Sequence, residues 1–271
     1  MTTARRNAVV FLGGGRITGA LLAGLRLAGY RKPIVVHDRH PRKLRQLRAR
    51  YDVKVEPDLQ RAIAQAHLLI IAVRPDSVRA LLHQIQPARP TLAVSLAAGI
   101  PLKNLRAWMG RPVHWGRAMP SPVARAGRGL TAITFDRAFP AAARREIRRF
   151  FALVGPVYEI PESKFDAFTV TYSSSHGYHA LDALAGAAVK LGLDRRTALT
   201  AAAHALADGI LAWRESGISL QALLHEAATP GGIAAATQAG MDKSGYRRVV
   251  EQGLRAGIGR AKRNARRPAG R

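Results

Sequence analysis

The sequence has no cysteine among its 271 residues. This absence excludes disulfide bonds, thiolate metal ligands and a cysteine nucleophile, and it makes the reducing cytoplasm the default expectation for the location. Long apolar runs are missing as well. The longest, around His67 to Val73, has the length of a strand and not of the roughly 18 residues that a membrane-spanning helix needs. The first six residues lack the apolar stretch of a secretory signal, so we expect no membrane segment.

Acidic residues are scarce, since 17 Asp and Glu oppose 43 Lys and Arg for a formal net charge of +26. A field of this sign attracts anionic ligands, which favours a small anionic substrate. The last stretch, Arg247 to Arg271, is especially basic and allows two interpretations: a tail that binds nucleic acid without sequence preference, or a solvated, frayed helix end. We favour the second, because basic residues are spread along the chain and no nucleic-acid motif accompanies them.

The first half of the chain alternates apolar runs with segments of helical periodicity. Leu68–Val73 is apolar throughout, which is typical of a central parallel strand covered on both faces. Repeated strand–helix–strand units predict an α/β fold, a Rossmann-type doubly wound parallel sheet. The predicted strands are 8–12, 33–37, 53–55, 68–73, 91–96, 113–115 and 131–135, and the predicted helices are 17–28, 41–50, 58–66, 75–85, 102–109 and 137–153.

The second half, from Ser163 onward, shows helical periodicity and almost no strand pattern. Its helices carry many Ala and Gly residues and are apolar on more than one face, which is typical of helices buried on more than one face. We therefore predict an all-helical domain that packs against a second copy, in a homodimer or a higher homo-oligomer. The domain boundary is placed between residues 158 and 159. The predicted helices are 179–191, 195–213, 220–228, 233–239 and 246–263.

A glycine loop, Gly13-Gly14-Gly15, follows the first predicted strand and opens a helix. Gly13 and Gly15 match the first two glycines of G-x-G-x-x-G, which allow a tight turn and a close approach of the backbone to a pyrophosphate at the helix N-terminus. The third position is Thr18, whose larger side chain predicts slight strain in helix–strand packing. Strand before and helix after favour a dinucleotide-binding domain over residues 1–158 rather than an ordinary glycine-rich turn.

The end of the second predicted strand bears on the choice of cofactor. Asp38 is suited to accept hydrogen bonds from ribose hydroxyls, which favours NAD(H), whereas Arg39 and Arg42 are suited to pair with a 2′-phosphate, which favours NADP(H). Arg42 is equally consistent with a solvated helix face. These two signals point to different cofactors. We favour NADP(H) and keep NAD(H) open as the alternative.

Taken in order, five stretches resemble pyrroline-5-carboxylate reductase, and the resemblance runs from Val9 to about Arg263. It implies an N-terminal Rossmann domain followed by a helical dimerisation domain, and an NAD(P)H-dependent reduction of pyrroline-5-carboxylate to proline. The five stretches are similar to the family's GGGNM, A-V-K-P, S-I-A-A-G, R-x-M-P-N and S-P-G-G: Gly13-Gly14-Gly15-Arg16-Ile17, Ala72-Val73-Arg74-Pro75, Ser95-Leu96-Ala97-Ala98-Gly99, Arg117-Ala118-Met119-Pro120-Ser121 and Thr229-Pro230-Gly231-Gly232.

The site residues follow from this resemblance together with the two strand-end arguments above. We predict no metal site. The predicted cofactor-binding residues are Gly13, Gly15, Arg16, Ile17, Asp38, Arg39, Val73, Arg74, Pro75, Ala97, Met119 and Pro120. The predicted substrate-binding residues are Ser121, Ser174, Gly231, Gly232 and Ile233, and the predicted catalytic residues are Ser174, His176 and Tyr178.

Departures from the family pattern concentrate where the family holds its substrate. The family's S-G-S-G-P-A-Y becomes 172–178 here, in which Ser174 and Tyr178 match and His176 replaces the proline. In the family's P-G-G-T-T, a loop that helps bind the substrate carboxylate, both threonines are replaced, by Ile233 and Ala234. His176 is either a proton donor or anion binder, or a helix N-terminal residue without a chemical role.

The implied chemistry is hydride transfer to a C=N bond, which needs orientation and a place for a carboxylate more than a strong base. That suits a sequence with no evident Ser-His-Asp or paired-carboxylate arrangement. Three functions stay open at this stage. They are reduction of pyrroline-5-carboxylate, reduction of a different imine or carbonyl on the same scaffold, and nucleotide binding without catalysis by a protein whose basic surface recruits a partner.

Overall fold

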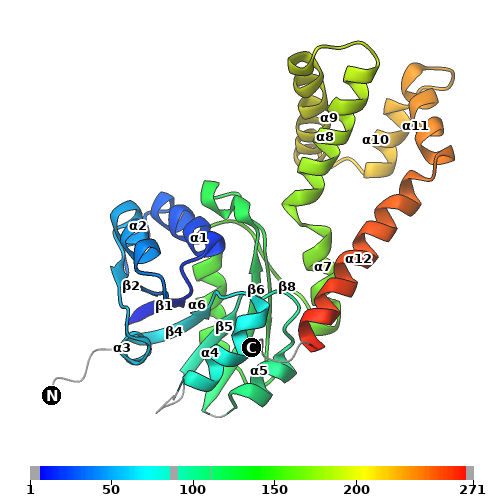
Figure 1. Ribbon diagram of the computed structural model, residues 1–271. Helices are drawn as coiled ribbons and strands as arrows, with labels where there is room; N and C mark the ends of the chain where they lie inside the picture. Colours follow the sequence, from blue (N-terminus) through cyan, green and yellow to red (C-terminus); the bar gives the residue numbers. More distant parts are fainter. Residues whose placement is uncertain (1–6, 86–90, 111, 267–271) are drawn as a thin grey trace. The chain divides into compact units, whose positions relative to one another are not determined.

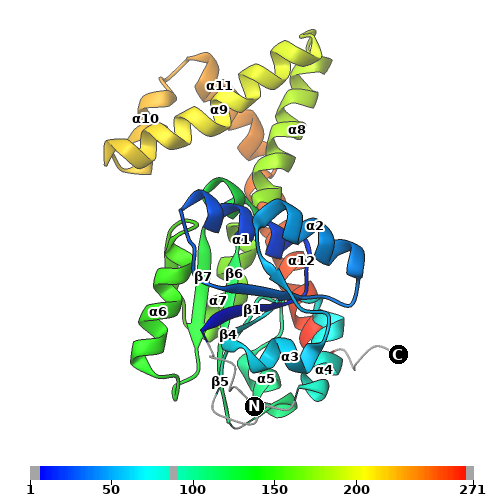
Figure 2. The same ribbon diagram turned by 90° about the vertical axis from the view of Figure 1, so that its left-hand side faces the viewer.

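The computed structural model describes residues 7–85, 91–110 and 112–266. Its contacts divide the chain into two compact units. We call the first, residues 1–172 and 257–271, the sheet unit, and the second, residues 173–256, the helical unit. Figures 1 and 2 show the elements of both. In the described part of the chain, no helix combines the length and the apolar character that crossing a bilayer requires.

The sheet unit is built on eight strands in the order β3-β2-β1-β4-β5-β6-β7-β8. The strands are β1 (Ala8–Leu12), β2 (Ile34–His37), β3 (Lys54–Val55), β4 (Ala66–Ile71), β5 (Thr91–Ser95), β6 (Val113–Pro120), β7 (Thr131–Phe135) and β8 (Val157–Glu159). The order 3-2-1-4-5-6 is that of doubly wound dinucleotide-binding sheets, with the direction of winding reversed between β1 and β4. The predicted Rossmann-type architecture is confirmed. The sheet is parallel at every pair except one, since β6 and β7 run antiparallel.

Helices cover both faces of the sheet (Figure 2). Alternate residues of a strand face opposite sides, so β1 sends Val9 and Phe11 into one core and Val10 and Leu12 into the other. The first core is closed by α1 (Arg16–Leu27), α2 (Pro41–Tyr51) and α6 (Ala141–Ala152), and the second by α3 (Leu59–Ala64), α4 (Pro75–Gln84) and α5 (Leu102–Trp108). All five residues of β1 are buried, as expected for a strand covered on both faces.

Several element boundaries differ from the predicted ones. The third helix ends at Ala64 and β4 already begins at Ala66, although the apolar pattern predicted helix to 66. The strand predicted over 113–115 extends to Pro120, because β5 pairs with it on one side and β7 on the other. The short strand β8, the 3-10 helix η1 (Pro122–Ala126) and the helix α7 (Glu162–Thr171) were not predicted as separate elements.

The two compact units do not divide at the predicted boundary of 158/159. The helix α7 and the last turns of α12 (Tyr246–Arg266) belong to the sheet unit. Arg117 on β6, only 2% exposed, explains part of this division, because its guanidinium donates to Glu162 Oε1 at 3.0 Å and to Asp166 Oδ1 at 2.9 Å on α7. These bonds attach α7 to the sheet across the predicted boundary.

The helical unit contains α8 (Ser174–Lys190), α9 (Arg195–Ser216), α10 (Leu220–Ala227), α11 (Ile233–Lys243) and the start of α12. The prediction of helix throughout the second half is confirmed, although α8 begins five residues before the predicted start at 179. The helices α8 and α9 pack together around a small core. In this unit, which is described throughout, the fully buried apolar residues are Ala185, Ala198 and Ala202.

Candidate functional site

The carboxyl ends of β2, β1, β4 and β5 lie in one row of the sheet, and β6 passes this row and ends at Pro120. Leu12 is paired with His37 and with Ile71, Ile71 with Ser95, and Ser95 with Arg117. The loops that follow these strands contain most of the predicted cofactor-binding residues: Gly13 and Gly15, Asp38 and Arg39, Val73 to Pro75, and Ala97. The fold therefore brings them to one edge, around the reversal between β1 and β4 where ligands bind in open α/β sheets.

Gly13 lies where no side chain fits. Its φ is +113°, and a Cβ atom would stand 2.6 Å from the carbonyl oxygen of Ala72 at the end of β4. The N–H of Gly13 donates to the carbonyl of His37 at 2.8 Å. The first glycine of the loop thus allows the chain to turn directly against two neighbouring strands.

Gly15 precedes the N-terminus of α1 and leaves room for a ligand. Among the described residues, no atom lies within 4 Å of the position that its Cβ would take. The first turn of α1 contains no acidic residue, and no side chain caps it. Its first backbone N–H groups therefore lack intrahelical partners, and the helix dipole favours an anion there. This cradle fits a pyrophosphate.

Thr18 does not show the mismatch that its size suggested at the third fingerprint position. It is fully buried, and its hydroxyl donates to the carbonyl of Gly13 at 2.6 Å. A buried hydroxyl is costly only when it lacks a partner. Thr18 instead links the first turn of α1 back to the glycine loop.

Asp38 holds the glycine loop in place. Its Oδ2 accepts from the N–H of Gly14 at 2.7 Å, and its Oδ1 accepts from the N–H of His40 at 2.8 Å. The Nζ of Lys43 lies 3.8 Å from Oδ2, and the carboxylate is largely buried. Both oxygens that were expected to face ribose hydroxyls are therefore engaged by the protein, while Arg39 and Arg42 beside them are exposed.

The remaining predicted residues of the sheet unit are mostly placed by the backbone. Arg74 precedes α4 and Pro75 begins it. Ala97 is buried, and its N–H donates to Ser95 Oγ at 3.3 Å. The last two residues of β6 are Met119 and Pro120.

Hydrogen bonds hold two residues at the end of β6, Met119 and Ser121. The hydroxyl of Tyr172 donates to the carbonyl of Met119, and burial raises the pKa of the Tyr172 phenol. Ser121, predicted to contact substrate, is buried, and its Oγ accepts from the N–H of Leu130 at 3.2 Å. That bond gives Ser121 a structural role that the sequence did not reveal.

The three predicted catalytic residues do not share one face of α8. Ser174 and Tyr178 are four residues apart and lie on the same face, whereas His176 is displaced by roughly 200° around the axis. Tyr178 is 67% exposed. The roles of all three stay predictions.

The predicted carboxylate loop lies at the N-terminus of α11. Gly231 has a φ of +78°, and Gly232 is the residue before the helix. Ile233, the first helical residue, is 89% exposed. The loop therefore presents an apolar side chain and backbone N–H groups, and no hydroxyl at the positions where the family reads threonine.

The basic C-terminal segment is not a frayed end over the residues that the structure describes. The helix α12 runs to Arg266, and Ala261 in its last turns is buried. The amide of Asn264 donates to the carbonyl of Ala98 at 3.1 Å, and the amide of Asn104 donates to the carbonyl of Ala265 at 2.8 Å. The interpretation as a frayed end is therefore wrong up to Arg266, although the basic side chains Arg260, Lys262 and Arg263 are exposed on the helix, and residues 267–271 lie outside the described part.

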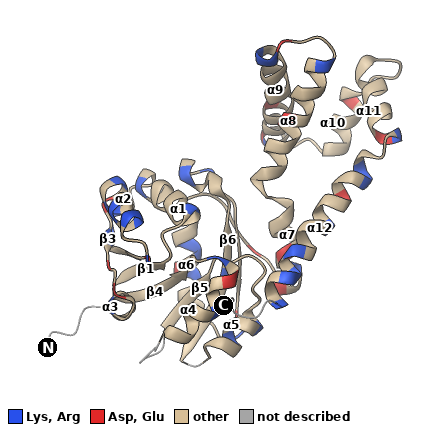
Figure 3. Cartoon of the chain, viewed as in Figure 1, with Lys and Arg blue, Asp and Glu red and all other residues tan. Residues whose placement is uncertain are grey.

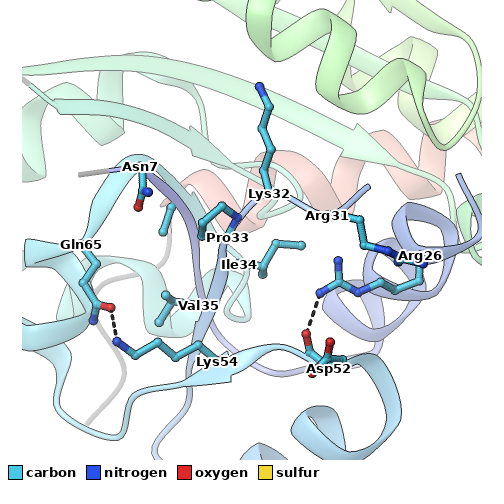
Figure 4. Close-up of a pocket in the computed structure, with 11 residues that line it drawn as sticks. Asn7, Arg26, Arg31, Lys32, Pro33, Ile34, Val35, Asp52, Lys54 and Gln65 are labelled. Atoms are coloured by element: carbon cyan, nitrogen blue, oxygen red, sulfur yellow. Dashed lines mark hydrogen bonds between the residues drawn. The ribbon is translucent and has the colours of Figure 1, made fainter. Parts of the chain in front are cut away.

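A cavity of about 400 Å³ lies at the opposite edge of the sheet, where β1, β2 and β3 begin (Figure 4). Two of the four cations that line it already serve the fold. The guanidinium of Arg26 donates to the carbonyls of Tyr30, Tyr51 and Asp52, and Lys54 Nζ donates to Gln65 Oε1 at 2.6 Å. The contacts of Arg26 close the C-terminal ends of α1 and α2, where cations are favoured.

Neither this cavity nor one of about 1250 Å³ beside the start of β6 is lined by a predicted site residue. Among the described residues, no group of three or more His, Asp or Glu is arranged to hold a metal ion. Lys and Arg are distributed over many elements (Figure 3).

The strand order, the glycine cradle at the reversal of the sheet and the all-helical second unit define a dinucleotide-binding protein of the Rossmann class. Two family models match the chain. "NADP oxidoreductase coenzyme F420-dependent" matches residues 8–99, and "Pyrroline-5-carboxylate reductase dimerisation" matches residues 162–264.

Curated relatives cover nearly the whole chain. The pyrroline-5-carboxylate reductase of Synechocystis is 31% identical over 92% of this chain and 95% of its own. The Thermus thermophilus enzyme of the same name is 37% identical over 73% of this chain and 77% of its own. The chain therefore belongs to the pyrroline-5-carboxylate reductase family.

Solved structures agree in fold. The pyrroline carboxylate reductase of Plasmodium falciparum, solved with NADP bound, has a TM-score of 0.86 at 19% identity, covering 96% of this chain and 99% of that one. The 1-pyrroline-5-carboxylate reductase of Streptococcus pyogenes has a TM-score of 0.86 at 22% identity, covering 94% of this chain and 98% of that one.

Proposed function

We propose that this protein uses NAD(P)H to reduce pyrroline-5-carboxylate to proline, with NADPH as its preferred cofactor. The observation that carries the proposal is the glycine cradle at the reversal of the sheet, in a member of the pyrroline-5-carboxylate reductase family. A bound reduced nicotinamide supplies the hydride. The chain's own residues bind, orient and exclude water.

The pyrophosphate would lie against Gly13 and Gly15, within reach of the backbone N–H groups of Arg16 and Ile17. The open space at Gly15 and the uncapped N-terminus of α1 support this assignment. The backbone of Val73 to Pro75 and of Ala97, which follow β4 and β5, and of Met119 and Pro120, which end β6, would line the rest of the cofactor.

The preference for NADPH rests on the contacts of Asp38. Its carboxylate binds the backbone of Gly14 and His40, so it orders the loop and leaves the recognition of the ribose to its exposed neighbours Arg39 and Arg42. A guanidinium binds a phosphate through two parallel hydrogen bonds. The Plasmodium falciparum relative was solved with NADP bound, which supports the same assignment.

Oxidation of NADPH and of NADH, followed at the nicotinamide absorbance with pyrroline-5-carboxylate, tests both the reaction and the preference. For Arg39→Ala we expect KM for NADPH to rise about 10- to 100-fold, the equivalent of one lost charge-assisted bond, and KM for NADH to change less than about twofold. Arg45→Ala is the control, since Arg45 is an exposed arginine on α2, the helix that follows Arg39. Equal effects of Arg39→Ala on the two cofactors would contradict the role of Arg39.

Substrate binding is proposed for Ser121, for Ser174 and Tyr178 on one face of α8, and for the backbone of Gly231 and Gly232 before α11. A protonated cyclic imine accepts hydride readily, so orientation matters more than a strong base. The backbone N–H groups at the start of α11 suit the carboxylate, since that helix has no acidic residue in its first turn.

A second candidate function is reduction of a different imine, and exposed Ile233 is the observation that favours it. The double variant Ile233→Thr, Ala234→Thr separates the two candidates. If the parent forms no proline and the double variant does, the scaffold serves another substrate. Cofactor binding without turnover on a panel of imines and ketones would support neither reductase.

We propose that the protein is a homo-oligomer, a homodimer at least, formed through the helical unit. The match of residues 162–264 to the dimerisation model supports this assembly, as do the exposed apolar side chains of the unit. The cytoplasmic location predicted from the absence of cysteine stays a prediction.

A further inference from the structure

The last turns of α12 return to the sheet unit with one face adapted for contact. Gly257, Ala261, Asn264 and Ala265 recur at helical spacing, so they share a face, while Arg260, Lys262 and Arg263 are exposed. Gly257 lies against α7, where a Cβ would stand 2.8 Å from Val170 Cγ1. Ala261 is 9% exposed. The last turns of α12 therefore have an exposed basic face and a packed face of small residues and one amide.

Gly99, the glycine of the S-L-A-A-G stretch after β5, meets this face. Its φ is +74°, and a Cβ would stand 2.4 Å from the carbonyl oxygen and 2.7 Å from the Cα of Ala261. Both the backbone conformation and the approach of α12 require glycine here. The close approach of α12 therefore accounts for this glycine.

Two amide side chains fasten the same contact in opposite directions. Asn264 on α12 donates to the carbonyl of Ala98 in the loop, and Asn104 on α5 donates to the carbonyl of Ala265 in the last turn of α12. Carbonyls in the last turn of a helix have no intrahelical partner, so Asn104 also caps α12. The C-terminal helix thus holds the loop between β5 and α5 at Ala98, and it holds α5, the helix that follows the loop, through Asn104.

This loop is part of the row of strand ends that forms the candidate dinucleotide site. The N–H of Leu96 donates to the carbonyl of Ile71 on β4, and Ala97 follows immediately. The next residue along β4, Ala72, is the one against which Gly13 packs. Four residues therefore separate the glycine loop from Ala98, the residue that Asn264 contacts: Ala72, Ile71, Leu96 and Ala97.

We propose that Asn264 and Asn104 are positioning residues, which fix the β5–α5 loop through α12 so that its backbone can line the bound dinucleotide. The proposal rests on the proposed cofactor-dependent function. On this proposal, Asn264 on α12 fixes the conformation of residues 96–100, which are distant from it in the sequence.

The test compares Asn264→Ala and Asn264→Asp with the parent in the cofactor-free protein and with NADPH. An aspartate has nearly the same shape but cannot donate to Ala98, and it repels that carbonyl. We expect hydrogen exchange at residues 96–100 to accelerate about tenfold in Asn264→Asp and less in Asn264→Ala. The Kd for NADPH, measured by fluorescence, should rise about tenfold in Asn264→Asp and about threefold in Asn264→Ala. The Tm of both variants should change little.

Two controls isolate the contact. Lys262→Ala changes the exposed face of the same turn, and Gln252→Glu adds the same charge at an exposed position of the same helix. Neither should change the exchange of residues 96–100 or the Kd. Asn104→Ala should repeat the effect of Asn264→Ala, because it removes the other half of the same contact.

Unchanged exchange and unchanged Kd in both Asn264 variants would overturn the proposal, as would faster exchange with an unchanged Kd. If the parent binds neither NADPH nor NADH, the proposed function itself fails. That failure is recognisable, because it affects the parent before any variant is compared.

Discussion

The sheet unit and the helical unit bury their apolar side chains in different ways. The sheet unit encloses large residues such as Phe11, Trp115 and Phe151 between its sheet and its helices. The helical unit buries three alanines and carries 16 of the 19 large apolar side chains that are exposed in the described residues. A single chain therefore encloses the core of the sheet unit but leaves most large apolar side chains of the helical unit exposed. The enclosed sheet can hold the candidate cofactor site, and the exposed side chains of the helical unit are suited to contact a second copy.

The largest effect expected from this contrast is on self-association. Ile210→Glu, on the 52% exposed side chain in α9, should weaken the homo-oligomer by about 10²- to 10⁴-fold, because a two-fold interface loses two buried side chains worth about 1.5–3 kcal/mol each. Analytical ultracentrifugation measures the dissociation. Leu27→Glu on α1, at a side chain 68% exposed in the sheet unit, is the matched control and should leave the assembly intact. Dissociation by both variants would remove the distinction between the units.

A pair of glycine substitutions sharpens the contrast in folding stability. Gly13→Ala should cost about 3 kcal/mol or more, because a side chain is strained at a φ of +113° and overlaps the backbone of Ala72. Gly186→Ala lies within α8 with no atom within 4 Å of its Cβ position among the described residues, so the helix itself should gain about 0.5–1 kcal/mol. Chemical denaturation of both variants measures the difference. Loss of the oligomer in Gly186→Ala would instead place that glycine in the interface.

The smallest effect concerns a phenol. Tyr172→Phe should cost about 1 kcal/mol at neutral pH, since it removes the bond to the carbonyl of Met119. Burial raises the pKa of Tyr172 in the folded state, so above its ordinary value near 10 the unfolded chain releases the proton first and stability falls as the pH rises.

Denaturation between about pH 9 and 11 should therefore show a shallower fall for Tyr172→Phe than for the parent. Part of the fall should persist, because burial also raises the pKa of Tyr30. Tyr178→Phe is the control, because Tyr178 is 67% exposed in the helical unit. The same slope in all three proteins would show that the burial of Tyr172 has no effect on how stability changes with pH.

Much of the sheet unit could be predicted because its information is local. Continuous apolar runs mark β1 and β4, Gly13 ends the first of them, and the order of elements then limits the topology. Pairing is not local. The strand β6 extends to Pro120 because β5 and β7 flank it, and the three residues of β8 are strand only because β7 pairs with them.

The candidate site divides in the same way. Gly13 and Gly15 have a local signature, and the sequence identified them correctly as a loop between strand and helix. The engagement of Asp38 by Gly14, the hydroxyl bond of Thr18 and the burial of Ser121 depend on tertiary neighbours and left no pattern. The rotation of α8, which turns His176 away from the face of Ser174 and Tyr178, also has no signal in the adjacency of these residues, and the role of His176 stays a prediction.

The contact between Ala98 and Asn264 has a consequence for biosynthesis, because 166 positions separate the two residues. At roughly 5–20 residues per second, a ribosome needs about 8 to 33 s to add Asn264 after Ala98. During that interval the strands of the nucleotide-binding sheet can already pair, while the loop after β5 waits for the helix that fastens it. The nascent chain can therefore fold the core of the sheet long before it can order the loop after β5. A chain truncated within α12 before Asn264 should have a folded sheet and a loop that lacks this contact.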